Sequence, residues 1–157
     1  KQLFDVSSIL DRVDDLSIVR KTFRNIAPIE LGYRGLDHLT PEDVLDDAYN
    51  TALNICLHGG LSREEYQWLT AGSHRVDGFI IIESYSMEKA VRDAAKVAYL
   101  PRLIRHGVNT VVHYSPEMDA ALIPQTIEDL SLNKLNRIKK ISLEAFFYLK
   151  QLEQLQK

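Results

Sequence analysis

The sequence has a single cysteine and no long apolar run. Cys56 alone cannot form an internal disulfide, which fits a reducing compartment. No apolar run approaches the roughly 20 residues that a membrane-spanning helix needs, and residues 1–12 carry acids where a secretory leader would be apolar. The first residue is Lys rather than Met, which suggests a processed chain or an excised domain. We therefore expect no disulfide, no membrane partner and a cytoplasmic location.

The length and amino-acid composition of the chain are those of an ordinary globular protein. A length of 157 residues predicts one helical domain over residues 1–157, and the hydrophobic fraction of 45% and charged fraction of 26% are typical. The net charge of −3 argues against general nucleic-acid affinity. The charge is uneven, however: residues 1–85 carry 8 basic and 14 acidic side chains, whereas residues 86–157 carry 11 basic and 8 acidic ones. Such asymmetry is a hint about charged partners.

Helical patterns fill most of the chain. Apolar residues recur three and four positions apart from Val6 to Ile26, with a break near Asp14. Thr40 before Pro41 predicts a helix start, and Ser62 with an acid three positions later predicts another.

Glycine and proline predict the breaks between helices. Pro28, Gly32 and Gly35 predict a loop after the first helical segment. Pro101 predicts the end of the helix that precedes it, and Gly107 predicts a turn.

The segment 76–114 has two interpretations. One is a β-α-β unit with strands at 79–84 and 110–113 and a helix capped by Ser86 between them. The other is a single helix from Val76 to Leu100. Because two strands alone rarely form a stable sheet, we predict a mainly α fold, a compact bundle of about five to seven helices. An α/β fold with the short two-stranded pairing is the alternative.

The spacing of Tyr85 and Lys89 is that of the catalytic Tyr and Lys of short-chain dehydrogenases. Such an enzyme also needs a glycine-rich turn for the cofactor pyrophosphate, and no G-x-G-x-x-G occurs in the sequence. The pair therefore indicates two side chains on one helix face, and no cofactor or metal site is predicted. A small enzyme remains a third hypothesis, and it requires Asp37, His38 and His113 to converge in one pocket.

Residues 133–156 predict a C-terminal amphipathic helix. Its apolar side holds Leu135, Ile138, Phe146, Phe147, Leu149 and Leu152. Two interpretations stay open: this side docks onto a protein partner or a second copy, or it closes the core of the domain itself.

Basic residues form the second candidate surface, for phosphates of a nucleic acid. They are Arg102, Arg105, Lys134, Arg137, Lys139 and Lys140. This surface requires the first two residues to lie beside the last four in space.

The predicted function follows from the absence of a catalytic constellation. We expect a protein-binding regulatory, adaptor or assembly module without catalytic activity, with a protein partner or a homo-oligomer. A nucleic-acid-binding regulator that uses residues 134–140 is the alternative.

Overall fold

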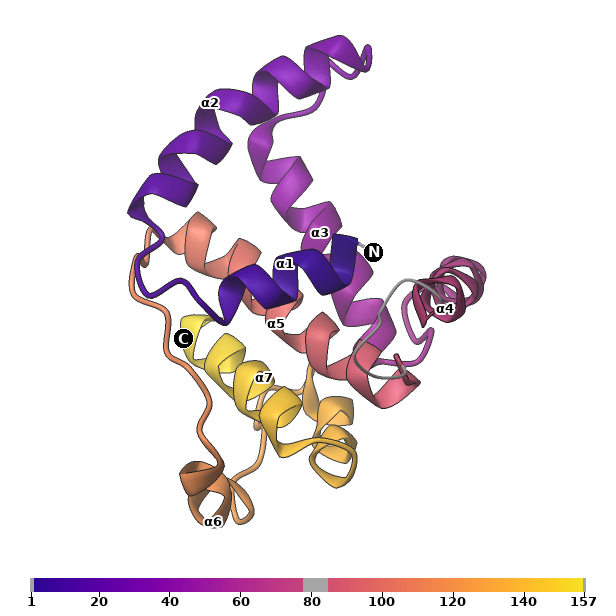
Figure 1. Cartoon of the computed structure of the whole chain (residues 1–157), viewed down its shortest axis with the longest axis vertical. Coiled ribbons are helices and arrows are strands. Elements are labelled where there is room, and N and C mark those ends of the chain that lie inside the picture. Colours follow the sequence, from indigo (N-terminus) through magenta and orange to yellow (C-terminus); the bar gives the residue numbers. More distant parts are fainter. Residues whose placement is uncertain (1, 78–84, 157) are drawn as a thin grey trace.

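The computed structural model describes residues 2–77 and 85–156, which are mainly α (Figure 1). The helices, with η for a 3-10 helix, are α1 (Gln2–Leu10), α2 (Ser17–Tyr33), α3 (Pro41–Cys56), α4 (Arg63–Asp77), α5 (Met87–His106), η1 (Pro116–Met118), α6 (Asp119–Leu122), η2 (Asn133–Lys140) and α7 (Leu143–Gln156). The described residues contain no β-strand, and one isolated bridge pairs Asp15 with Thr110. The mainly α prediction is confirmed. Of the alternative strand pairing, residues 79–84 lie outside the described ranges and residues 110–113 form no strand.

Side-chain caps start the helices where the sequence predicts them. The Thr40 hydroxyl accepts from the Asp43 N–H at 3.2 Å, and the Asp43 carboxylate accepts from the Thr40 N–H at 2.7 Å. Ser62 accepts from the Glu65 N–H at 3.3 Å, and Ser86 caps α5 in the same way. Residues 85 and 86 are not helical, so the predicted single helix from Val76 to Leu100 is wrong, whereas the predicted Ser86 cap is confirmed. These bonds satisfy N–H groups that have no partner within the helix.

The predicted loop after residue 26 is wrong, because α2 continues through Pro28 and Gly32 to Tyr33. Ala27 and Leu31 are both buried. Residues four positions apart lie on the same side of an α-helix, so a helical conformation lets both side chains pack at once. Pro28 lies on the exposed side, where water can hydrate the carbonyl that loses its helical partner. Packing of Ala27 and Leu31 thus outweighs the helix-breaking tendency of Pro28 and Gly32.

The predicted helix end at Pro101 is also wrong. Pro101 lies inside α5, and the helix continues to His106 because Leu103 and Ile104 belong to the core. The helix ends one turn later, where Gly107 adopts a positive φ of 70° and its N–H donates to the Ile104 carbonyl at 3.3 Å.

The predicted C-terminal helix is divided into two elements, η2 and α7. Buried Leu132, Leu135 and Ile138 recur every third residue, which matches the three residues per turn of a 3-10 helix. Ser142 then starts α7, since its hydroxyl accepts from the Ala145 N–H at 3.1 Å. The chain changes direction at this point, and both elements cover the core.

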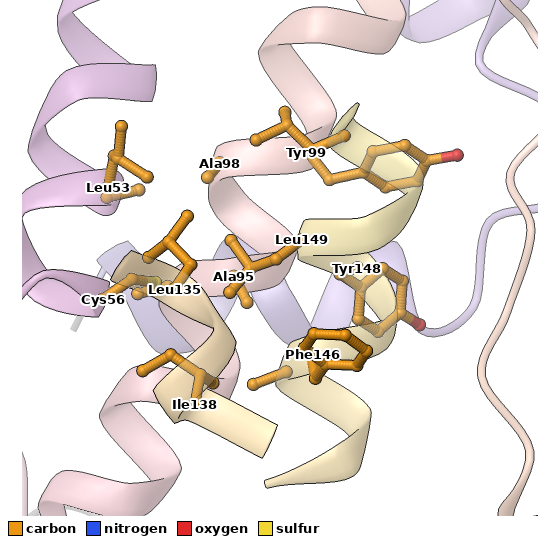
Figure 2. Close-up of a cluster of buried hydrophobic side chains, with 14 of the residues drawn as sticks. Leu53, Cys56, Ala95, Ala98, Tyr99, Leu135, Ile138, Phe146, Tyr148 and Leu149 are labelled. Atoms are coloured by element: carbon orange, nitrogen blue, oxygen red, sulfur yellow. The ribbon is translucent and has the colours of Figure 1, made fainter. Parts of the chain in front are cut away.

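α5 lies at the centre of the molecule and packs against α1, α3 and α7. Ala94, Ala95 and Ala98 are at most 1% exposed, so the neighbouring helices approach α5 closely. Burial raises the pKa of the Cys56 thiol to about 12, which leaves it unreactive. Figure 2 shows side chains of α3, α5, η2 and α7 meeting in one cluster that includes Leu53, Cys56, Ala95, Ala98, Tyr99, Leu135, Ile138, Phe146, Tyr148 and Leu149.

α2 and the first half of α3 extend away from this core (Figure 1). α2 packs mainly on α3. At its base, the Leu16 N–H donates to the Asn109 carbonyl at 2.7 Å, and the Val111 N–H donates to the Asp14 carbonyl at 3.0 Å. These two bonds fix the start of α2 to the segment that follows α5.

Candidate functional site

The predicted partner-binding side chains of the C-terminal region lie inside this chain. Those at most 4% exposed include Leu135, Ile138, Phe146, Phe147, Leu149 and Leu152. All six belong to one buried cluster that also holds side chains of α3 and α5, and Figure 2 shows four of them: Leu135, Ile138, Phe146 and Leu149. Their position favours the interpretation in which η2 and α7 close the domain's own core.

Two of the predicted phosphate-binding residues form ion pairs with α3. Arg105 forms an ion pair with Asp46 at 2.7 Å and donates to the Glu42 carbonyl at 2.9 Å. The Arg102 guanidinium lies 3.9 Å from the centre of the Tyr49 ring and 3.6 Å from the Asp46 carboxylate. Both arginines therefore join α5 to the first half of α3.

The other four basic residues belong to η2. Arg137 donates to the Leu57 carbonyl at 2.8 Å, just after α3 ends. Lys139 donates to the carbonyls of residues 123 and 125 and lies 4.6 Å from the Phe146 ring centre. Lys134 and Lys140 are exposed. Leu57 follows Asp46 by eleven residues, or about 16 Å of helix, so the six residues do not form one continuous basic surface.

The three residues of the enzyme hypothesis lie at opposite ends of α2. His113 pairs with Asp14 at 3.0 Å, just before α2 starts. Asp37 and His38 follow its end, and a helix of this length spans about 25 Å. The described residues also contain no group of three or more His, Cys, Asp or Glu that could hold a metal ion.

Tyr85 has an environment opposite to that of a catalytic tyrosine. Its hydroxyl donates to the Asp93 carboxylate at 2.8 Å, and Ser7 donates to the same carboxylate at 2.9 Å. Burial, and then the Asp93 charge and hydrogen bond, raise the pKa of Tyr85. A dehydrogenase tyrosine requires a lowered pKa, so the Tyr85 hydroxyl is structural.

A cavity of about 480 Å³ lies between α1, α3, α4 and α5. Asp47 is the only carboxylate among its described lining residues, and the hydroxyls of Thr51 and Tyr85 are bonded to Glu65 and Asp93. Its apolar lining includes Leu3, Val6, Ile55, Leu69 and Val97. The described part of the cavity can hold an apolar group but offers no paired acid, base or nucleophile.

Apolar side chains are exposed along one side of α2. We call this set the outer face of α2: Ile18, Ile26, Ile29 and Tyr33, which are 76%, 47%, 51% and 84% exposed. At 3.6 residues per turn they fall in a sector about 80° wide, and the buried pair Ala27 and Leu31 lies about 160° away. α2 therefore has two apolar sides, and only one of them is covered by α3.

A buried lysine of α5 forms ion pairs with the residue that follows α1 and with α7. The Lys96 side chain is 3% exposed, and its ammonium group lies 2.7 Å from Asp11 and 2.6 Å from Glu144. It also lies 5.6 Å from the Tyr148 ring centre. These contacts compensate the cost of removing the charge from water.

Glu153 holds the segment before η2 against α7. Its side chain, 1% exposed, accepts from the N–H groups of Glu128 at 2.6 Å and Asp129 at 2.8 Å and from Lys150 at 2.5 Å. Burial acts to raise the pKa of Glu153, but these hydrogen bonds outweigh burial and lower it.

Replacing Glu153 with Gln is expected to reduce the free energy of unfolding at pH 7 by about 1–3 kcal/mol. Because the folded pKa is lowered, the carboxylate contributes fully above its unfolded pKa of about 4.3 and loses that contribution as pH falls through the lower folded value. Urea unfolding at pH 7 and below pH 4 should therefore show a difference between wild type and variant that shrinks with acid. Glu117→Gln, at an exposed site, is the control. A difference that is the same at both pH values contradicts this account.

The described helices include none that is long and apolar enough to cross a membrane. Comparison with models of protein families, with curated proteins and with solved structures finds no match for the chain. Its function must therefore be inferred from its own surfaces and contacts.

Proposed function

We propose that the chain is a protein-binding assembly or adaptor module whose contact surface is the outer face of α2. One observation carries the proposal: four large apolar side chains are exposed along one side of a helix whose opposite side is packed. Single exposed apolar residues are common on protein surfaces, whereas several large ones gathered on one side of a helix are a feature of interaction sites.

The stripe has enough apolar area to contribute to binding. Full burial of a large apolar side chain contributes about 1.5–3 kcal/mol. Scaled by their exposed fractions, the four side chains offer about 4–8 kcal/mol. Association costs about 4–15 kcal/mol, so the partner has to add an apolar surface of its own.

The outer face is presented on a helix that is already formed. The inner side of α2 rests on α3, and the Leu16 N–H is bonded to the Asn109 carbonyl at its base. At the other end, the Leu36 N–H donates to the Leu31 carbonyl at 2.9 Å. A preformed helix pays little ordering entropy on binding, which suits recognition of an apolar groove or of another helix.

The nucleic-acid alternative has weaker support. Arg102, Arg105, Arg137 and Lys139 make contacts within the chain. Of the six predicted residues, Lys134 and Lys140 are exposed and form no hydrogen bond or ion pair with the described residues. Two lysines are a small phosphate-binding surface.

Site-specific photo-crosslinking tests the proposal. A benzophenone side chain in place of Ile29, in cells that make the chain, is expected to form adducts with a discrete protein. The same group in place of exposed Lys134 should give none, and Ile26→Asp should abolish the adduct while far-ultraviolet circular dichroism stays unchanged. The absence of adducts at position 29, or equal labelling from position 134, overturns the proposal.

A further inference from the structure

We propose that the cavity between α1, α3, α4 and α5 binds a small molecule with an apolar body and a single cationic group, the chemistry of a primary alkylamine. The site is separate from the outer face of α2, because none of its described lining residues belongs to α2. The inference therefore goes beyond the proposed function and does not depend on it. It is carried by the size and lining of the cavity, by its one carboxylate and by the exposure of Trp68.

The cavity has the size and the lining of a small-molecule site. Its volume of about 480 Å³ lies within the range of about 300–1,000 Å³ that is usual for ligand pockets. α3 contributes the small side chains of Ala48 and Ala52, which leave the space open, and larger apolar side chains of the other three helices surround it. Water gains little from such walls, so an apolar molecule of fitting shape displaces it favourably.

The hydroxyl groups of the described lining are already bonded within the chain. The Thr51 hydroxyl donates to Glu65 at 3.1 Å, and the Tyr85 hydroxyl donates to Asp93 at 2.8 Å. The Thr70 hydroxyl donates to backbone carbonyls of α4 at 3.0 Å. These groups require no polar partner from a ligand, whose body is therefore expected to be hydrocarbon.

One carboxylate gives the site its charge preference. Asp47 is the only carboxylate among the described lining residues, and no lysine, arginine or histidine accompanies it there. It is exposed, and it forms no ion pair with the residues that the structure describes. A cationic group at the mouth of the cavity thus meets an available counter-charge, whereas an anionic group is repelled.

Trp68 adds a second preference for a cation. It lines the cavity, yet 72% of its surface is exposed. The indole ring combines a large apolar area with a face that attracts positive charge. A ligand in the cavity would cover part of this ring, so binding gains apolar contact from α4 as well as from α3 and α5.

Fluorescence of Trp68, the single tryptophan of the chain, measures the binding directly. Octylamine is a cation at pH 7. Below the concentration at which it forms micelles, it should shift the tryptophan emission to shorter wavelength until the site is saturated. Hexylamine should bind about fifteenfold more weakly, since each buried CH₂ group strengthens binding about fourfold. An unchanged emission, or equal affinity for the two amines, overturns the inference.

Filling the cavity tests its location. Ala48→Phe should weaken octylamine binding at least tenfold, whereas Ala121→Phe, at an exposed site of α6 outside the lining, should bind as wild type. Ala48 is only half-buried, and circular dichroism checks that both variants fold. If the ring prevents folding, Ala48→Val replaces it and should give a smaller loss. Binding by the folded Ala48 variant that equals wild type contradicts the assignment.

An anionic probe and a neutral variant test the cationic group. Wild type should bind octylamine more tightly than octanoate. Asp47→Asn should lower the affinity for octylamine about two- to fivefold, as expected for an exposed ion pair, and leave the affinity for octanol unchanged. Glu117→Gln, at an exposed site outside the lining, is the control. Octanoate bound as tightly as octylamine, or an undiminished affinity in Asp47→Asn, rules out the cationic class.

Discussion

Replacement of Leu149 with Asp is expected to unfold the chain, whereas replacement of Ile29 with Asp should leave it folded. Leu149 is 0% exposed in the centre of the cluster in Figure 2, where a carboxylate would have neither water nor a counter-charge. Burial of an unpaired charge costs several kcal/mol, and loss of the leucine contacts adds about 2–5 kcal/mol. Together these costs are comparable to the whole stability of a typical domain, about 5–15 kcal/mol. Ile29 is 51% exposed, so its aspartate stays in water.

Circular dichroism and urea unfolding of the two variants measure this difference. Leu149→Ala is the milder version, and we expect it to fold with about 2–5 kcal/mol less stability than wild type. A folded Leu149→Asp that has lost a partner would contradict the interior position of α7 and restore its apolar side as a binding surface.

Removal of both counter-charges of Lys96 is expected to cause the second large loss of stability. In the double variant Asp11→Asn, Glu144→Gln, the Lys96 ammonium group stays buried with neutral neighbours. An uncompensated buried charge costs about 3–5 kcal/mol. Each single variant leaves one carboxylate in place, so its loss in free energy of unfolding should be less than half of that of the double variant.

Substitution of the lysine in the same background provides the matched test. Lys96→Met keeps most of the side-chain volume and removes the charge, so the triple variant should recover most of the lost stability. Urea unfolding of the single, double and triple variants gives the required cycle. A triple variant no more stable than the double variant would show that the loss comes from the contacts of Asp11 and Glu144 with other groups.

Helix starts were predictable from the sequence because they depend on neighbouring residues. Thr40, Ser62 and Ser86 each cap a backbone N–H three positions later, and this contact needs no other part of the chain. The predicted breaks at the prolines were wrong, because whether a proline ends a helix depends on how distant parts of the chain pack against that helix. Pro28 and Pro101 lie in helices that α3 and the core hold together, and no local signal at either proline reveals this.

The candidate surface was missed for the same reason. Once a loop is placed after residue 26, Ile29 and Tyr33 no longer share a helix face with Ile18, and the stripe disappears. The regular spacing of Leu132, Leu135 and Ile138 was present in the sequence and could have indicated a 3-10 helix. The apolar side of α7 was recognised, but its burial depends on α5 and η2, which periodicity alone cannot place.

The base of α2 has a consequence for the order in which the chain is made. Residues 14 and 16 are bonded to residues 111 and 109, which the ribosome adds more than ninety residues later. Synthesis at about 5–20 residues per second separates the two events by several seconds. α2 and α3 thus leave the ribosome well before the base of α2 can be bonded to residues 109 and 111.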